Sequence, residues 1–193
     1  MLTDKSKATH EVQCAVASGT GSTDGVSAGG VFTIQCHDKD GNLKWETSTH
    51  NLVVNVGLQD MNAKYFTGSA YTATWYLGVY GAGSTNNPAA SDTMSSHAGW
   101  TEVTAYSQAT RPACTFGTPT TADPSVATNS ASPATFSING TTTIGGAFLT
   151  SNNTKGGTTG TLFSAGDFAS PGDRSVVSGD TLTLTYTFNL DAV

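Results

Sequence analysis

The chain has 193 residues, a length typical of one domain, and only 11% of them are charged. The net charge is −6, and Lys and Arg form no cluster. Because phosphate neutralisation drives most nucleic-acid affinity, we expect no direct nucleic-acid binding and no attraction to anionic membranes. No stretch reaches the roughly 18 apolar residues of a membrane span, and the start lacks an apolar signal-peptide region.

The N-terminal residues 1–30 are expected to form a flexible or extended arm, followed by a single β-sandwich domain over 31–193. Residues 18–30 are almost entirely Gly, Ser, Thr, Ala and Asp and have little to bury. Before them, alternating apolar residues predict a short strand: Val12, Cys14 and Val16. The arm is either a mobile tail or a segment that becomes ordered on a partner.

A β-hairpin is predicted next, over 31–47, around the turn Asp38–Gly41. Placing Ile34 opposite Trp45 separates apolar from polar cross-strand pairs on the two faces. The acidic turn does not have the spacing of a calcium loop, because its Gly falls at the fourth position instead of the sixth. We therefore predict a turn there and no metal site.

After the hairpin, the period changes from two to that of a helix. The apolar residues stand at i, i+4, i+7 and i+11 and predict a short amphipathic helix over about 53–66: Val54, Leu58, Met61 and Tyr65. Asn51 or Asn55 is the candidate N-cap, and Gly68 is the candidate stop.

Alternation returns in 75–80, which predicts a strand with Trp75 and Leu77 on one face and Tyr76 and Tyr80 on the other. Residues 81–100 are a predicted loop with one helical turn at 91–97. Short strands are expected at 101–107, 111–117, 133–139, 142–150, 160–168 and 176–190.

The clearest strand signal is Thr181–Leu190, in which apolar residues alternate with Thr or Asn over ten positions. Such a period of two is typical of a half-buried strand with a polar outer face. With many short strands and one helix, the sequence predicts an all-β fold. We expect a two-sheet, jelly-roll or Greek-key-like sandwich.

Few groups of residues in this sequence have the types and spacing of a catalytic or metal-binding site. Asp167 and Asp173 could flank a sugar as in a glycosidase, although both also suit loop tips. The histidines show no metal-binding spacing, and no nucleotide-binding glycine motif is complete. We therefore expect no catalytic residue, no metal and no cofactor, with a β-sandwich hydrolase as an alternative class.

Aromatic residues are the better candidates for a functional surface. Large rings can anchor a protein interface or stack on sugars, and we expect a partner interface among Tyr71, Tyr76, Tyr80, Trp100 and Tyr106. Trp45 and Trp75 are predicted to belong to the core because of their alternation. The three cysteines, Cys14, Cys36 and Cys114, are widely spaced and predict free thiols in a reducing cytosol, with a Cys14–Cys36 disulfide as the alternative.

Seven strings, taken as a set, resemble small virion proteins of tailed bacteriophages, and within that group the head decoration, or cement, proteins. They are D-K-D-G-N-L-K-W-E (38–46), H-N-L-V-V-N-V-G-L (50–58), W-Y-L-G-V-Y (75–80), S-D-T-M-S-S-H-A-G-W-T-E (91–102), Y-S-Q-A-T-R-P (106–112), T-K-G-G-T-T-G-T-L-F-S-A-G-D-F (154–168) and V-V-S-G-D-T-L (176–182).

The resemblance implies a β-sandwich, often jelly-roll-like, that is made in the host bacterial cytoplasm and assembles as a homotrimer on the capsid exterior of the virion. There it would clamp neighbouring copies of the major capsid protein without covalent links. Such proteins have no catalytic residues to carry over, and residues 1–30 are longer than the family pattern. The alternative is another virion part, a phage tail or host-binding protein with a lectin-like sandwich.

Overall fold

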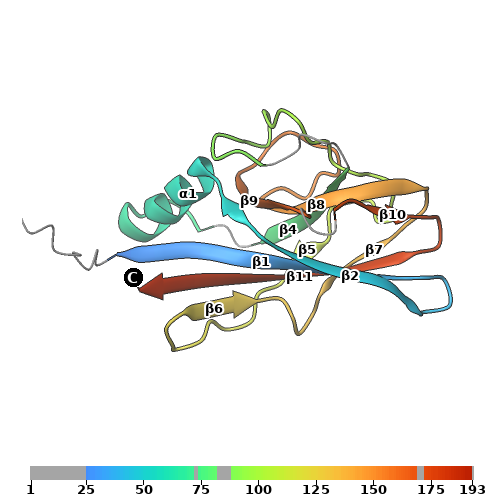
Figure 1. Ribbon diagram of the computed structural model, residues 1–193. Coiled ribbons are helices and arrows are strands. Elements are labelled where there is room, and N and C mark those ends of the chain that lie inside the picture. The colour runs from blue at the N-terminus through green and yellow to red at the C-terminus, as the bar shows by residue number, and fades with distance from the viewer. Residues whose placement is uncertain (1–24, 72–73, 82–87, 169–171, 193) are drawn as a thin grey trace, which may run out of the picture.

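Two antiparallel β-sheets pack face to face, and one helix lies at one end of them (Figure 1). The computed structural model describes residues 25–71, 74–81, 88–168 and 172–192. The elements are β1 (Val26–His37), β2 (Leu43–His50), β3 (Leu52–Val53), α1 (Asn55–Phe66), β4 (Trp75–Gly81), β5 (Ala113–Cys114), β6 (Ser125–Thr128), β7 (Ala134–Ser137), β8 (Thr142–Thr150), β9 (Leu162–Asp167), β10 (Arg174–Val176) and β11 (Thr181–Ala192).

The first sheet has the order β2-β1-β11-β6, with β7 also paired to β11. The second has the order β3-β9-β8-β4-β5, with β10 also paired to β8. Twice, two short strands lie end to end beside one long strand: β7 and β6 along β11, and β10 and β9 along β8. The predicted all-β, two-sheet sandwich with one short helix is therefore confirmed.

The core is built on the pairing of the first and last described strands. β1 and β11 run antiparallel from Val26 opposite Ala192 to His37 opposite Thr181. In the half of this pair that is farther from α1, every second residue points inward and is fully buried: Phe32, Ile34 and Cys36 of β1, and Leu182, Leu184 and Tyr186 of β11. The alternation predicted for the closing strand is thus confirmed.

The predicted hairpin forms, but its register differs from the prediction. Trp45 lies opposite Cys36 instead of Ile34. One residue of this difference arises because His37 pairs with Leu43 instead of Asn42, and the other arises from a β-bulge between Cys36 and His37. The turn is closed by the Asp38 carboxylate, which accepts hydrogen bonds from two backbone N–H groups of the turn, each at 2.9 Å. Because the difference at Trp45 is two residues, Trp45 keeps the predicted face, whereas Leu43, predicted opposite Cys36, lies opposite His37 and is 55% exposed.

Several predicted boundaries need correction. The predicted linker reached residue 30, whereas β1 begins at Val26, so 26–30 belong to the sheet. The predicted strand at 101–107 is an irregular segment with single bridges only, and 91–97 contains a β-turn instead of a helical turn. β6 is a strand that the sequence did not predict.

The caps of α1 differ in part from the prediction. Val54 is the N-cap, and neither Asn51 nor Asn55 caps the helix with its side chain. Instead, the Asn55 N–H donates to the Ala90 carbonyl at 2.8 Å. Gly68 follows the C-cap with φ of 71°, the left-handed conformation expected of a helix stop.

The cysteines that the structure describes, Cys36 and Cys114, are free, as predicted, and both are buried. Burial, with a smaller contribution from the Asp180 charge, raises the pKa of the Cys36 thiol to about 11, and burial raises that of Cys114 to about 12. Both thiols are therefore protonated and unreactive at neutral pH. The predicted short strand at 12–16 and Cys14 lie outside the described residues.

The alternation of β11 predicts a sharp difference between adjacent positions. We expect Leu184→Ala to lower the free energy of unfolding by about 2–5 kcal/mol, since it opens a cavity in the core. Thr185→Ala, on the outer face, should cost less than about 1 kcal/mol. Urea unfolding of the two variants checks this, and equal losses would contradict the inward orientation of Leu184.

Candidate functional site

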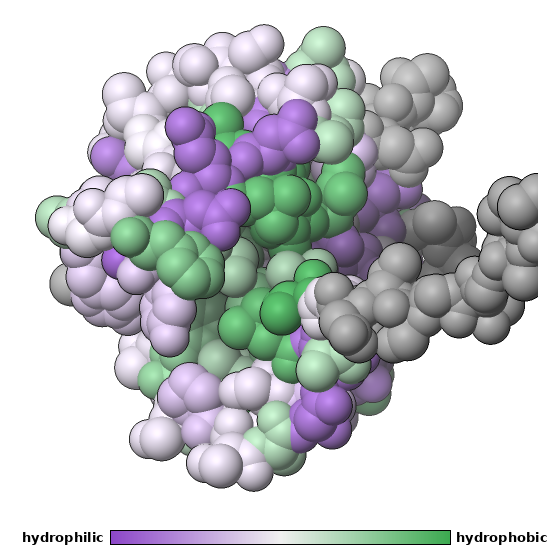
Figure 2. Space-filling model, turned by 90° about the vertical axis from the view of Figure 1, so that its left-hand side faces the viewer, coloured by the Kyte–Doolittle hydropathy of each residue, from purple (hydrophilic) through white to green (hydrophobic). Residues whose placement is uncertain are grey.

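A large hollow of the described surface lies at the α1 end of the sandwich, with a volume of about 790 Å³. Figure 2 looks onto this end and shows hydrophobic residues gathered in its middle. Much of the interior lining is aromatic and comes from α1, both sheets and the segment before β6: Met61, Trp75, Phe116, Phe163, Tyr186 and Phe188. We call this hollow the α1 groove.

Three aromatic rings from three different strands form the floor of the α1 groove. Phe163 of β9 meets Trp75 of β4 edge to face, with ring centroids 5.3 Å apart, and meets Phe188 of β11 at 5.4 Å. T-shaped ring pairs contribute stabilising free energy beyond that of the area they bury. These contacts within the protein therefore hold the floor of the groove in place.

The position of α1 over this floor depends on a glycine. Gly57 is the only residue of α1 classed as buried, and a Cβ there would collide with the carbonyl oxygen of Phe163. Its missing side chain lets the helix approach β9 closely. The predicted apolar stripe is therefore only partly correct: Met61 packs against the core, whereas Leu58 and Tyr65 are exposed.

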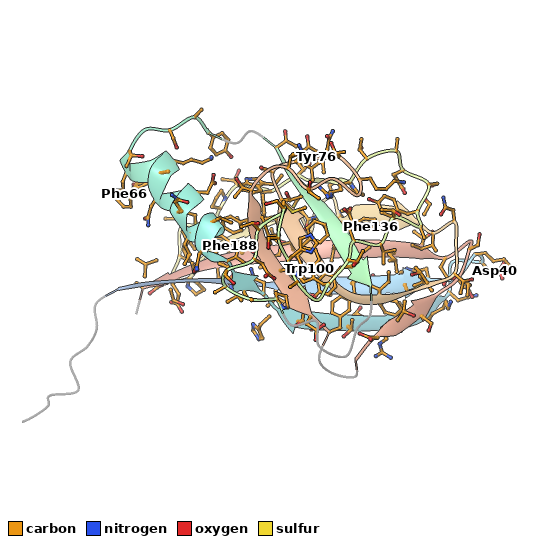
Figure 3. The ribbon with its side chains drawn as sticks, turned by 90° about the horizontal axis from the view of Figure 1, so that it is seen from above. Asp40, Phe66, Tyr76, Trp100, Phe136 and Phe188 are labelled. Carbon is orange, nitrogen blue, oxygen red and sulfur yellow. The ribbon has the colours of Figure 1, made fainter. Side chains whose placement is uncertain are left out.

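This helix position leaves three aromatic side chains in water at the rim of the α1 groove. Tyr65, Phe66 and Tyr71 are 84%, 76% and 79% exposed, and all three line the groove. Phe66 lies at the outer end of α1 (Figure 3), and its ring meets that of Tyr65 edge to face at 4.9 Å. We call these three residues the aromatic rim.

The charged residues of the groove lining neutralise each other. Asp60 and Lys64 stand one turn apart on α1, and the Lys64 ammonium lies 2.7 Å from the Asp60 carboxylate. The α1 groove therefore offers apolar and aromatic surface and little net charge. Such a surface can bind apolar side chains of a protein, or the faces of sugar rings.

The five aromatic residues predicted for the interface do not form one exposed surface. Tyr71 belongs to the aromatic rim, and Tyr76 is half-buried on β4. The other three are in the interior and are corrected here: Tyr80 and Tyr106 are completely buried and Trp100 is 3% exposed. They support packing and cannot present an interface in this fold.

Loop packing explains why these rings are buried. The outer face of the second sheet carries its own small core, in which Trp100 from the long loop after β4 contacts Tyr80 and Phe148, with centroids 5.0 and 5.2 Å apart. The Trp100 indole N–H donates to the Asp92 carboxylate at 3.0 Å. The loop therefore covers a face that strand alternation alone predicts to be exposed.

A buried ion pair fixes this covering loop. The Arg111 guanidinium donates to both carboxylate oxygens of Glu102, at 2.9 and 2.7 Å, and to the carbonyls of Asn152 and Gly157. Arg111 is 1% exposed, so its charge depends on these partners. The network joins the segment after β4 to the β8–β9 connection.

The carboxylates of the hydrolase alternative lie outside the α1 groove. Burial raises the pKa of the Asp167 carboxyl, and the negative charge of Asp173 raises it further. A raised carboxyl pKa suits a general acid, but neither residue lines the groove. Among the described residues, no group of three or more His, Cys, Asp or Glu side chains could hold a metal ion.

Comparison with known proteins returns no relative: no protein-family model, no curated protein and no solved structure matches the chain. In the part of the chain that the structure describes, no helix has the length and apolar character needed to cross a membrane.

The Arg111 network yields a stability prediction. Arg111→Ala leaves the Glu102 carboxylate buried without its partner, so we expect the free energy of unfolding to fall by about 3–5 kcal/mol. Removing the exposed Lys39–Asp40 pair with Lys39→Ala should leave stability nearly unchanged. Thermal and urea unfolding compare the variants, and a small loss for Arg111→Ala would show that the loop is held by other contacts.

Proposed function

We propose that this chain is a structural virion protein that binds the outside of a bacteriophage capsid and stabilises contacts between major capsid subunits. The observation that carries the proposal is the α1 groove with its aromatic rim. Exposed apolar hollows of this kind mark interaction sites on soluble proteins, and Tyr and Phe are enriched in interfaces. The resemblance of the seven strings to phage head decoration proteins supports a capsid as the partner.

The physical demands of such a role fit the rest of the fold. Clamping neighbouring subunits needs area, shape complementarity and symmetry, and it needs no activated side chain. We propose a homotrimer, since three linked copies on a threefold capsid position would multiply one modest contact by avidity. An acidic protein on the outer surface also has no tendency to compete for the packaged genome.

A tail or host-binding role is the second candidate, favoured by one specific observation. Tyr65 and Tyr71 expose most of their rings beside an open groove, and exposed aromatic rings can stack on sugars. If this alternative holds, variants that lack these two rings would lose binding to a host glycan and keep full occupancy on capsids.

The proposal predicts that the aromatic rim is required for capsid binding. We expect Tyr65→Ser combined with Phe66→Ser to weaken binding to capsids that lack the protein by at least about tenfold, because interface aromatics are frequent hot spots. Co-sedimentation with such capsids measures the affinity. Light scattering of the free protein reports its oligomeric state.

The matched control is Leu43→Ser, which removes an exposed apolar side chain at the first residue of β2. The β1–β2 turn before it, which holds Asp40, lies at the end of the sandwich away from α1 (Figure 3). It should bind as the unchanged protein does. Equal binding by the rim variant and the control would contradict the proposed surface. A strict monomer that binds no capsid would contradict the proposed function itself.

A further inference from the structure

Two carboxylates and a tyrosine hydroxyl gather on the outer face of the second sheet. Tyr80 of β4, Gly146 of β8 and Asp167 of β9 lie directly opposite one another across three adjacent strands. Residues that are directly opposite in neighbouring strands have their side chains on the same face of the sheet. Because Tyr80 belongs to the small core on the outer face, Asp167 points to that face as well.

The glycine between them lets the Tyr80 side chain lie across β8 toward Asp167. A Cβ atom at Gly146 would collide with the hydroxyl oxygen of Tyr80, so this hydroxyl lies over the middle strand of the three. Asp167 is the next residue across, and neighbouring strands are only about 5 Å apart. The hydroxyl and the Asp167 carboxylate are therefore neighbours on one face.

Asp173 joins this group from the other end of the connection between β9 and β10. The two strands follow each other along the same side of β8, with β9 ending at Asp167 opposite Gly146 and β10 beginning opposite Ile144. Asp173 directly precedes β10, so the chain returns it to the neighbourhood of Asp167. Burial raises the pKa of the Tyr80 hydroxyl, and the charges of both carboxylates raise it further, as expected of groups close in space.

None of these three groups has a polar partner among the described residues. The Tyr80 side chain is completely buried, and its hydroxyl makes no hydrogen bond. Asp167 is half-buried and Asp173 is exposed, and neither carboxylate has a described partner. Apart from the exposed Asp191, every other described carboxylate accepts a hydrogen bond or forms an ion pair: Asp38, Asp40, Glu46, Asp60, Asp92, Glu102, Asp123 and Asp180.

A hard divalent cation supplies what this group of side chains lacks. All three offer oxygen, which favours calcium over zinc or copper, whose sites use nitrogen and sulfur ligands. Two carboxylates balance the charge of one calcium ion. They come from separate positions, one of them exposed, and calcium tolerates the flexible geometry that this gives, whereas magnesium demands a near-ideal octahedron.

We propose that Asp167, Asp173 and Tyr80 form a calcium site on the outer face of the second sheet. The two carboxylates bind the ion, and the Tyr80 hydroxyl accepts a hydrogen bond from a water molecule that the ion holds. The ion fastens the connection between β9 and β10 to β4. Sequence spacing does not predict the site, because its groups come from different strands. The inference goes beyond the proposed function and holds whether or not the aromatic rim binds a capsid.

Calorimetric titration of the full-length protein with calcium chloride tests the site. We expect one ion per chain, with a dissociation constant of roughly 0.1–1 mM, as for weak calcium sites with few charged ligands. Asp173→Asn removes a charged ligand at an exposed position and should weaken binding at least about tenfold. Calcium should also raise the unfolding midpoint of the unchanged protein and leave that of Asp173→Asn where it was.

Asp191→Asn is the matched control, since Asp191 is also an exposed carboxylate without a described partner, and both variants remove one negative charge. It should bind calcium as the unchanged protein does. Equal weakening in the two variants would assign the binding to net charge and overturn the proposal. No binding by the unchanged protein would overturn it as well.

Tyr80→Phe tests the third group separately, because it removes the hydroxyl and keeps the ring in its packing. We expect calcium binding to weaken by about tenfold, as for other groups that orient the shell around a bound ion. Near-ultraviolet circular dichroism checks that the fold is unchanged. An unchanged calcium affinity in Tyr80→Phe would overturn the site as proposed, independently of any capsid assay.

Discussion

The rest of the structure depends on the antiparallel pairing of β1 with β11, whose inward residues form the centre of the core. Phe32 and Tyr186 stack across this pair with centroids 4.5 Å apart. The Tyr186 hydroxyl is hydrogen-bonded with Ser164 of the opposite sheet, at 3.2 Å, and with Asn51, at 2.8 Å. This strand pair therefore joins the two ends of the chain and fastens one sheet to the other.

The local pattern of the sequence is sufficient to predict a strand where one face of the strand is exposed and the other is buried. β11 shows this best, because Thr and apolar residues alternate, and its Thr residues stay half-buried while Leu182, Leu184 and Tyr186 are fully buried. The same reasoning failed for Tyr80, whose outward face is covered by a loop that Trp100 and the Arg111–Glu102 pair hold in place. Loop packing of this kind brings together residues that are far apart in sequence. The periodicity of a single strand therefore cannot predict which of its outward residues a loop will bury.

The candidate site was predictable only in part, for a related reason. The sequence predicts an interface role for Tyr71, whereas the helical pattern places Tyr65 on the buried face and gives no role to Phe66. The helical template assumes that large apolar residues face the core. Here, Gly57 makes the closest contact and turns the helix so that its C-terminal aromatics remain in water. A glycine three residues after Val54 was the available signal.

These features together describe a weakly charged β-sandwich with one apolar end, and we propose that this end contacts a capsid. A cryo-electron-microscopy reconstruction of virions carrying the protein tests this proposal. We expect density for the sandwich on the capsid exterior, with α1 and its aromatic rim against the shell or a neighbouring copy. Density on the tail, or on the capsid with the aromatic rim facing solvent, would contradict it.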